Sequence, residues 1–303
     1  MRIVFMGTPD FAVASLEACI SQGHQILAVV TAADKLGGRG HNQWMHSAVK
    51  KYALDNDLPL LQPEKLRDAS FIQQLKDLKA DVFVVVAFRM LPEIVWRIPT
   101  LGTINVHGSL LPKYRGAAPI NWAIIRGEIE TGVTSFLISK EIDTGGILAQ
   151  KAIPIDPQDD FGSLYDKMKV LGSELLVETL DLMQKGSINP MEQDDLQASS
   201  APKLDTDTGK IDFNQSALDI HNLIRGLSPV PGAWFEHNAL TYKIFESRYE
   251  LLPHQYEIGS MHKSDKKTLK IYAVDGALMP TVLQAEGKRK MKVEEFLNGW
   301  NPA

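Results

Sequence analysis

Asp81-Val82-Phe83-Val84-Val85-Val86-Ala87 (DVFVVVA) is the most strand-like stretch of this 303-residue sequence. Its five central residues are apolar, and four of them are β-branched. A strand with one solvated face alternates apolar and polar residues, whereas a continuous apolar run is typical of a parallel sheet covered on both faces. The stretch therefore predicts a central strand of an α/β domain.

Short apolar runs alternate with helical patterns on both sides of this stretch. The expected strands are residues 3–6, 24–31, 58–61 and 102–107, and the expected helices are residues 11–20, 47–55 and 68–78. Asp10 is expected to cap the first helix. The alternation predicts a doubly wound α/β domain with a mostly parallel sheet, in which ligands bind beyond the carboxyl ends of the strands.

The pattern changes after about residue 186. Residues 190–208 are rich in Ser, Asp, Thr, Gln and Pro, which is typical of a linker. Strand-like runs then follow at residues 234–235, 240–245, 269–274 and 280–285, separated by turn signals. They predict a smaller antiparallel β-barrel of the oligonucleotide-binding (OB) type. We therefore expect a first domain over residues 1–189, a linker over 190–208 and a second domain over 209–303.

The composition is that of a folded cytoplasmic protein. Hydrophobic residues make up 44% of the chain and charged residues 23%, so disorder is excluded. No apolar run approaches the roughly 20 residues of a membrane-spanning helix. Cys19 is the only cysteine and lies in an apolar-periodic stretch, so we expect an inert core thiol in a reducing compartment. We also expect a monomer that does not contact a membrane.

The net charge of −5 argues against a protein that binds nucleic acid over its whole surface. Residues 201–303 carry 13 basic and 13 acidic side chains, so the whole deficit falls in the first 200 residues. Lysine and arginine cluster at residues 263–270 and 288–292. Either local contacts with RNA or an ordinary solvated face would account for these clusters.

Gly7-Thr8-Pro9-Asp10 follows the first expected strand, where a dinucleotide-binding fingerprint would lie. Only one of the three expected glycines is present and Pro9 lacks a backbone donor, so a tight strand-to-helix turn is the better interpretation. His41 and His46 are close in sequence but have no obvious third ligand, and no HExxH or CxxC motif occurs. We therefore expect no metal.

Asn105-Val106-His107 ends an expected strand and is followed by Gly108-Ser109-Leu110-Leu111-Pro112. Residues two apart on a strand point to the same side, so Asn105 and His107 can face one site. An amide donates to a developing oxyanion, and an imidazole can donate or shuttle a proton, as acyl transfer to nitrogen requires. The alternative is that both side chains only satisfy backbone groups at the end of the strand.

Asp143 precedes a glycine-containing turn between two further strand-like runs, residues 133–138 and 147–155. Aspartate is common in such turns for purely structural reasons. A functional carboxylate could instead orient His107 or accept its proton. Sequence spacing does not decide between these interpretations, because the contact would be long-range.

The order of these residues resembles a known superfamily. Asn105, His107, Ser109-Leu110-Leu111-Pro112 and Asp143-Thr144-Gly145 resemble the folate-dependent formyltransferases. Longer stretches are similar to the methionyl-tRNA formyltransferase family within it: FMGTPDFAV (5–13), SLLPKYRGAAPIN (109–121), ETGVT (130–134) and RGLSPVPGAW (225–234). The resemblance spans nearly the whole chain.

The resemblance implies a Rossmann-like catalytic domain followed by an OB-like domain that helps to hold tRNA. It implies that Asn105, His107 and Asp143 are catalytic, and that Ser109, Leu110, Leu111 and Pro112 form the folate-binding run. The formyl donor would be 10-formyltetrahydrofolate and the acceptor the free amine of methionyl initiator tRNA, a reaction that supports translation initiation.

The loop of residues 32–44 both matches and departs from the family pattern. The family places a glycine-flanked arginine toward the tRNA acceptor stem, and Arg39 within Gly37-Gly38-Arg39-Gly40 matches this feature. Lysines often follow in the family, whereas here the next residues are His41-Asn42-Gln43-Trp44. Trp44 is expected either to stack on an unpaired base or to pack on the domain and anchor the loop.

Two other functions remain open from the residues. A purine-pathway or sugar-nucleotide formyltransferase would share the folate donor, but it would not need the OB-like domain or the loop around Arg39. A non-catalytic nucleic-acid-binding module would not need Asn105, His107 and Asp143.

Overall fold

The computed structural model describes residues 1–37 and 43–300 of the chain. The chain forms two compact units. Unit 1 comprises Met1–Gly116, Gly132–Ile153 and Tyr165–Ser200, and unit 2 comprises Ala117–Thr131, Pro154–Leu164 and Ala201–Ala303. Two segments from the first part of the chain therefore belong to the unit that contains its last third. The domain boundaries expected at residues 189 and 209 stay a prediction.

Unit 1 is built on a seven-stranded sheet in the order β10-β9-β7-β6-β1-β2-β5. The strands are β1 (Arg2–Gly7), β2 (Gln25–Val30), β5 (Leu60–Leu61), β6 (Val82–Val86), β7 (Thr103–His107), β9 (Glu130–Leu137) and β10 (Ile147–Pro154). The pairs from β5 to β7 are parallel, and β9 pairs antiparallel to β7. The predicted mostly parallel sheet is therefore confirmed.

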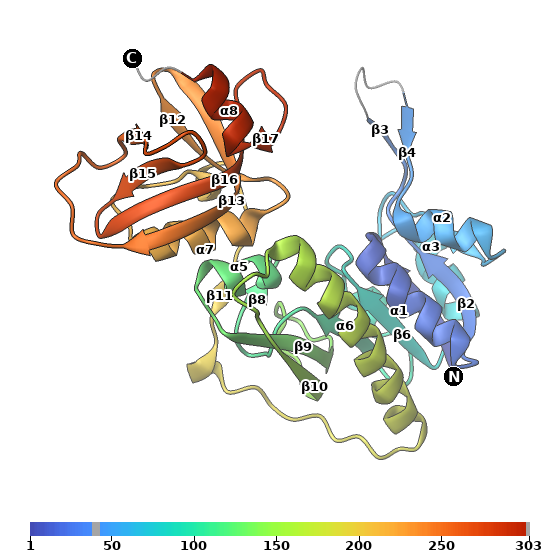
Figure 1. Cartoon of the computed structure of the whole chain (residues 1–303). Coiled ribbons are helices and arrows are strands. Elements are labelled where there is room, and N and C mark those ends of the chain that lie inside the picture. The colour runs from blue at the N-terminus through green and yellow to red at the C-terminus, as the bar shows by residue number, and fades with distance from the viewer. Residues whose placement is uncertain (38–42, 301–303) are drawn as a thin grey trace. The chain divides into compact units, whose positions relative to one another are not determined.

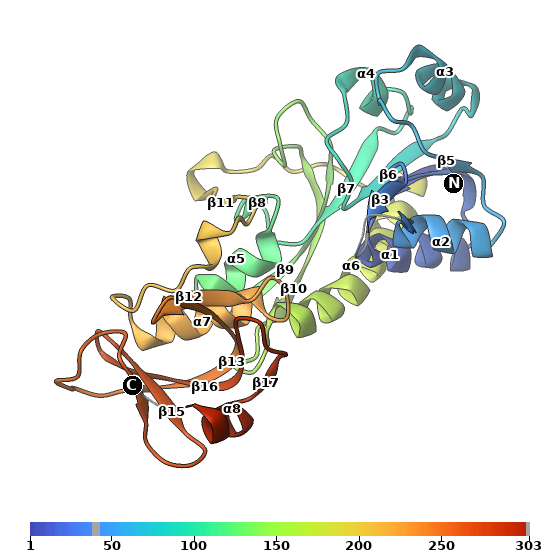
Figure 2. The ribbon, with the colours of Figure 1, turned by 90° about the horizontal axis from the view of Figure 1, so that it is seen from above.

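Helices cover both faces of this sheet, as Figure 2 shows. The helices are α1 (Asp10–Ser21), α2 (Ala48–Asp55), α3 (Ala69–Asp77), α4 (Glu93–Trp96) and α6 (Phe161–Gln184). All five residues of β6 are buried. Phe83 and Val85 pack with Phe71 and Leu75 of α3 in one hydrophobic cluster. Burial on both faces is the reason for the continuous apolar run in β6.

The turn after β1 differs in one detail from the expectation. Pro9 is the N-cap of α1, and its side chain makes no capping bond. Asp10 is the first helical residue, so the prediction that it caps the helix is wrong. Its carboxylate instead accepts a hydrogen bond from the Tyr165 hydroxyl (2.6 Å). A carboxylate in the first turn also interacts favourably with the helix dipole.

Cys19 lies on the inner side of α1 and is fully buried. Burial raises the pKa of its thiol to about 12. Little thiolate therefore forms near neutral pH, and the predicted core position of Cys19 is confirmed.

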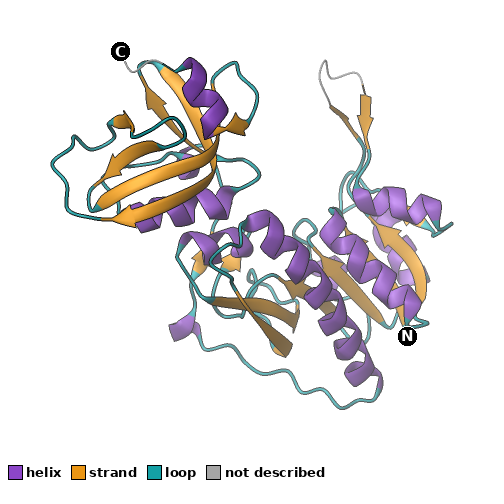
Figure 3. Cartoon of the chain, viewed as in Figure 1, coloured by secondary structure: helices purple, strands orange, loops and turns teal. Residues whose placement is uncertain are grey.

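Unit 2 contains an antiparallel half-barrel, drawn in orange in the upper left of Figure 3. Its strands follow the order β12-β13-β16-β15-β14, and β17 pairs with β16. They are β12 (Ala233–His237), β13 (Leu240–Leu251), β14 (Met261–Lys263), β15 (Leu269–Ala273), β16 (Gly276–Ala285) and β17 (Met291–Lys292). The predicted antiparallel pairing is confirmed. Within the described residues the sheet runs from β12 to β14 without closing, so it forms a half-barrel.

Among the described residues, the α-helices that lie wholly in unit 2 are α5 (Pro119–Ile125), α7 (Ala217–Leu227) and α8 (Val293–Gly299). Ile220 and Ile224 of α7 join Ile244, Ile271 and other strand residues in one buried core. The Asn121 side chain of α5 donates to the carbonyl of Gly226 in α7 (2.7 Å). This contact explains why α5, although distant in sequence, is part of this unit.

His221 of α7 gives unit 2 a predicted dependence on pH. Burial, with the nearby charge of Arg225, lowers the pKa of His221 to about 4. The unfolded chain therefore binds a proton that the folded unit does not, so stability is complete above about pH 6.5 and falls as the pH drops toward 4. For a partly exposed ring we expect a loss of about 1–2 kcal/mol.

Urea-induced unfolding of the wild type and His221→Gln at pH 7.5 and 4.5 tests this expectation. The variant should lose less unfolding free energy between the two pH values than the wild type. His262→Gln, which replaces an exposed imidazole of the same unit, is the control. Equal losses in all three proteins would show that His221 does not contribute.

The remaining elements are short. They are β3 (Lys35–Gly37), β4 (Gln43–Met45), β8 (Arg115–Gly116), β11 (Ser200–Ala201) and two 3₁₀ turns, Asp195–Gln197 and Asp207–Gly209. Figure 1 shows β3 and β4 as a hairpin next to α2. Within the described residues, no helix has both the length and the apolar character that a membrane crossing needs.

Candidate functional site

Strand β7 places Asn105 and His107 at the carboxyl edge of the parallel part of the sheet. Asn105 pairs with Val85 of β6 on one side and Phe136 of β9 on the other. His107 lies one residue beyond the last pair with β6, Val86 with Val106. Since the two residues are two apart on one strand, their side chains lie on the same face. This is the edge at which open α/β sheets bind ligands.

The hydrogen bonds of His107 define how its ring can act. Nε2 lies 2.9 Å from the backbone carbonyl oxygen of Tyr114. A carbonyl can only accept, so Nε2 carries a hydrogen and donates it. Nδ1 therefore holds the lone pair in the neutral ring, and it lies 3.7 Å from Oδ2 of Asp143. Nδ1 can accept a proton, and once protonated it faces a carboxylate.

Asp143 lies in the connection between β9 and β10 and is brought to His107 from a distant part of the sequence. Its Oδ2 accepts a hydrogen bond from the backbone N–H of Gly116 (2.9 Å). The side chains of His107 and Asp143 are only 7% and 12% exposed. Water therefore screens their interaction less than it screens a surface pair. The long-range contact that sequence spacing could not decide is present.

Asn105 carries an unsatisfied polar atom. Its Oδ1 is buried and has no hydrogen-bond partner among the described residues. Buried polar atoms in folded proteins nearly always have partners, and an exception calls for an explanation, such as a role in catalysis or in binding. A bound molecule with an N–H group would satisfy this oxygen, and the Nδ2 group of the same amide is a donor.

The predicted folate-binding run of Ser109, Leu110, Leu111 and Pro112 follows β7 directly. The Ser109 side chain is buried, and its hydroxyl donates to the carbonyl of Lys113 (2.6 Å). Leu111 packs with Phe136 and Ile147 in a small hydrophobic cluster. The Ser109 hydroxyl hydrogen is therefore used within the protein, and its oxygen can still accept a hydrogen bond.

Two polar side chains that the sequence did not single out fix this run. The Thr134 hydroxyl donates to the Ser109 carbonyl (2.7 Å) and accepts from the Leu111 N–H (3.0 Å). The Gln150 amide donates to the Leu111 carbonyl (2.9 Å). Thr134 lies on β9 opposite His107, and a polar residue on a buried strand was the available signal.

The structure bears on Trp44 but not on Arg39, which lies outside the described residues. Trp44 is 62% exposed and pairs across the hairpin with Leu36 of β3, itself exposed. The base of the hairpin is joined by Asp34 and His46, which lie 3.0 Å apart. This exposure favours the interpretation that Trp44 stacks on a base over the interpretation that it anchors the loop, and both stay predictions.

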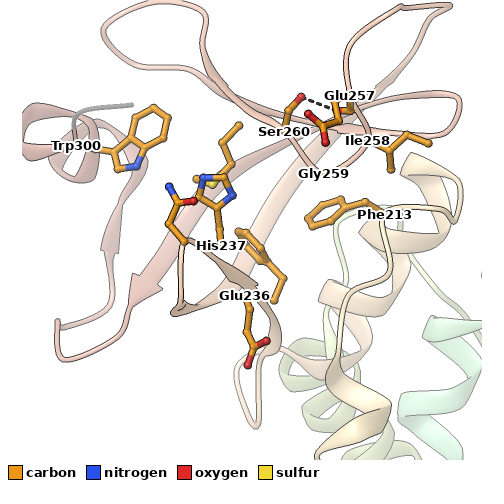
Figure 4. A pocket seen from close by; sticks show the side chains of 11 residues that line it. Phe213, Glu236, His237, Glu257, Ile258, Gly259, Ser260 and Trp300 are labelled. Carbon is orange, nitrogen blue, oxygen red and sulfur yellow. Dashed lines mark hydrogen bonds between the residues drawn. The ribbon is translucent and has the colours of Figure 1, made fainter. Parts of the chain in front are cut away.

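A cavity of about 430 Å³ lies in unit 2, and Figure 4 shows its lining. Phe213, His237 and Trp300 contribute to its walls together with two acidic residues, Glu236 and Glu257. Asn105, His107 and Asp143 all belong to unit 1. The lining residues of this cavity all belong to unit 2, so the cavity is not part of the candidate site in unit 1. In the described ranges, no group of three or more His, Cys, Asp or Glu side chains gathers as metal ligands would.

Comparison with known proteins adds a consistent pattern. Residues 1–180 match the formyl transferase family, and residues 203–301 match the formyl transferase C-terminal domain family. The chain is 48% identical to the methionyl-tRNA formyltransferase of Flavobacterium psychrophilum, covering 99% of this chain and 96% of that one. It is 45% identical to the enzyme of the same name from Bacteroides thetaiotaomicron, with the same coverage.

The fold also matches a solved structure. The N-formyltransferase from Helicobacter canadensis, crystallised with folinic acid and dTDP-3-aminofucose, superimposes with a TM-score of 0.71. Its sequence is 22% identical, and the match covers 92% of this chain and 98% of that one. At this identity the similarity concerns the fold.

Proposed function

The chain belongs to the methionyl-tRNA formyltransferase family, and we propose that Asn105, His107 and Asp143 carry out its reaction, the transfer of a formyl group from 10-formyltetrahydrofolate to the amine of methionyl initiator tRNA. One observation carries the assignment of these residues. Nδ1 of His107 lies 3.7 Å from the largely buried carboxylate of Asp143, and the strand of His107 also carries Asn105, whose Oδ1 has no partner among the described residues.

The neutral amine attacks the formyl carbon, a C–N bond forms, and the formyl oxygen becomes negatively charged. Asn105 can serve both reactants through one amide. Oδ1 accepts an N–H of the amine and so directs its lone pair, while Nδ2 donates to the developing oxyanion. The lack of a protein partner for Oδ1 fits this role, because a partner would compete with the amine.

His107 can stabilise the same oxyanion only in its protonated form. Nε2–H is committed to the Tyr114 carbonyl, so Nδ1 must carry a proton before it can donate. Asp143 stabilises that form by its charge. The amine loses a proton during the reaction, and Asp143 organises its removal, directly or through a water molecule. The tetrahedral species then collapses, the bond to the folate nitrogen breaks, and that nitrogen takes up the proton that the amine has lost.

We place the folate along residues 109–112 and the tRNA acceptor end at the loop that contains Arg39. The backbone of the 109–112 run is held in place by Thr134 and Gln150, which gives a fixed surface next to His107. For Arg39, the support is the glycine-flanked arginine of the family pattern. Asn105, His107 and Asp143 come from one chain, so the proposed site needs no second copy and we expect a monomer.

The basic clusters of unit 2 give limited support to an RNA contact. Lys270 pairs with Glu250, Arg289 with Glu295, and Lys263 donates to the carbonyl of Leu297. Several of these cations are therefore engaged within the unit itself. A contact of unit 2 with tRNA would have to share or replace these partners, which fits a modest contribution to affinity rather than a dominant one.

Acceptor specificity is tested by an assay of formyl incorporation with three acceptors: methionyl initiator tRNA, glycinamide ribonucleotide and an amino-sugar nucleotide. We expect turnover with the tRNA alone. Turnover with either small acceptor but not with the tRNA would contradict the proposed acceptor. If no acceptor were formylated while folate and tRNA still bound, the chain would be a binding protein and not an enzyme.

Trp44 offers a test of tRNA contact by the hairpin. Trp44→Ala is expected to raise KM for tRNA about ten- to hundredfold, because base stacking on an aromatic ring contributes about 1–3 kcal/mol. The thermal unfolding temperature without tRNA should not change, because the ring is largely exposed. Leu36→Ala, which removes the cross-strand neighbour but no ring, is the matched control. A lower unfolding temperature with an unaltered KM for tRNA would show a structural role instead.

A further inference from the structure

Asp143 has a backbone conformation that needs support. Its φ angle is +56°, in the left-handed region that few residues other than glycine adopt without cost. The connection that carries it also passes close to β9, since a Cβ added at Gly145 would lie 1.6 Å from the Leu137 carbonyl oxygen. The carboxylate is therefore presented by a tight turn whose geometry other groups must hold.

Gln193 makes the contacts that hold this turn. Its Nε2 donates to the backbone carbonyl of Asp143 (2.8 Å) and to that of Gly145 (2.8 Å). The two carbonyls on either side of Thr144 are therefore joined by one amide group. A primary amide has two N–H donors, so both are used here.

The other end of the Gln193 amide is also fixed. Its Oε1 accepts from Nε (3.1 Å) and Nη2 (2.8 Å) of Arg115. Arg115 precedes Gly116, whose N–H donates to the Asp143 carboxylate. The Gln193 backbone is itself held nearby, because Met191 and Ile147 exchange two backbone hydrogen bonds of 2.8 Å. Gln193 thus holds the two carbonyls of the turn, and Gly116, the neighbour of Arg115, holds the Asp143 carboxylate.

We propose that Gln193 is a positioning residue for formyl transfer: together with Arg115 it holds the Asp143 turn so that the carboxylate faces Nδ1 of His107. The inference rests on the proposed function of Asp143. The Gln193 amide donates to the backbone carbonyls of the turn and accepts from Arg115, so it acts on the Asp143 carboxylate through the backbone of the turn. The alternative is that Gln193 only fastens the 191–199 segment to unit 1.

Gln193→Met is the first test. Methionine has a similar length but none of the four hydrogen bonds. We expect kcat to fall about ten- to hundredfold, as a small displacement of a catalytic group can cause, with KM for both substrates unchanged. Gln197→Met is the matched control. Gln197 lies four residues further on, and its side chain donates to Asp194 rather than to the Asp143 turn. An unaltered kcat in Gln193→Met would overturn the proposal.

Gln193→Glu separates positioning from fastening. The carboxylate keeps its contact with Arg115 as an ion pair but has no donor for the two carbonyls, and it repels them. If Gln193 only fastens its segment, Gln193→Glu should retain wild-type kcat. If it positions the turn, kcat should fall as in Gln193→Met. Arg115→Lys, which keeps the charge near Asp195 but loses the paired contact with Gln193, gives the same information if either Gln193 variant fails to fold.

A double-mutant cycle links the effect to Asp143. In an Asp143→Asn background, Gln193→Met should cause little further loss, because the group it positions is already disabled. Two independent losses that multiply would refute the proposal. If Asp143→Asn alone retains the wild-type rate, the proposed function of Asp143 fails, whereas an impaired Asp143→Asn with a normal Gln193→Met overturns only this inference.

Discussion

Asn105→Ala is expected to lower turnover by about a hundred- to a thousandfold, the usual loss for one donor to an oxyanion. The substitution removes the Nδ2 donor and also the Oδ1 acceptor that would direct the amine. Oδ1 has no partner among the described residues, so the fold loses no bond at that atom. The variant should therefore fold and bind folate while its chemical step is slow.

Single-turnover formylation with saturating folate and tRNA measures this step without product release. Asn56→Ala is the control for the loss of an asparagine side chain in unit 1, since Asn56 is exposed and donates only to the Tyr52 carbonyl. A near wild-type single-turnover rate in Asn105→Ala would exclude the oxyanion role. A much lower thermal unfolding temperature of Asn105→Ala would instead show that Asn105 stabilises the fold.

The sheet of unit 1 could be predicted because its signal is local. The buried run of β6 is apolar throughout, and the expected strands around it correspond to β1, β2, β5 and β7. The expected third strand, residues 58–61, is shorter in the structure, where β5 comprises only Leu60–Leu61. Strand ends depend on pairing with a neighbour, which a single sequence does not contain.

Unit 2 was predicted less completely. Helix α7 was not expected, although Ser216 caps it and accepts a hydrogen bond from Asp219, a recognisable start signal. The membership of α5 in this unit depends on contacts such as Asn121 with Gly226, 105 residues apart, which no periodicity can reveal.

The candidate site also combines features with a local sequence signal and features that depend on long-range contacts. The shared face of Asn105 and His107 follows from the two-residue period of a strand, so it could be predicted from spacing. The proximity of Asp143 could not, because it depends on a left-handed turn and on bonds to Gly116 and Gln193. Gln193 lies 50 residues beyond Asp143 in a segment whose composition indicated only a linker. The residues that support a site are thus harder to find than those that act in it.

Asp143→Asn is expected to reduce turnover by about 10²- to 10⁴-fold, the range that positioned acid–base groups contribute. Asparagine fills the same space, tolerates the left-handed conformation and can still accept from the Gly116 N–H. It cannot carry the charge that stabilises protonated His107 at 3.7 Å, and it cannot take up the proton that the amine loses. The loss should therefore appear in kcat, with folate binding retained.

The control is Asp57→Asn, because Asp57 has a similar φ angle of +53° but is exposed on the surface of unit 1. It separates the effect of an asparagine in a left-handed turn from the effect of the lost carboxylate. Single-turnover formylation and a folate-binding titration are measured on both variants. Near-normal rates in Asp143→Asn would leave Asp143 as a turn residue, and the chemistry would then have to be carried by Asn105 and His107 without a carboxylate.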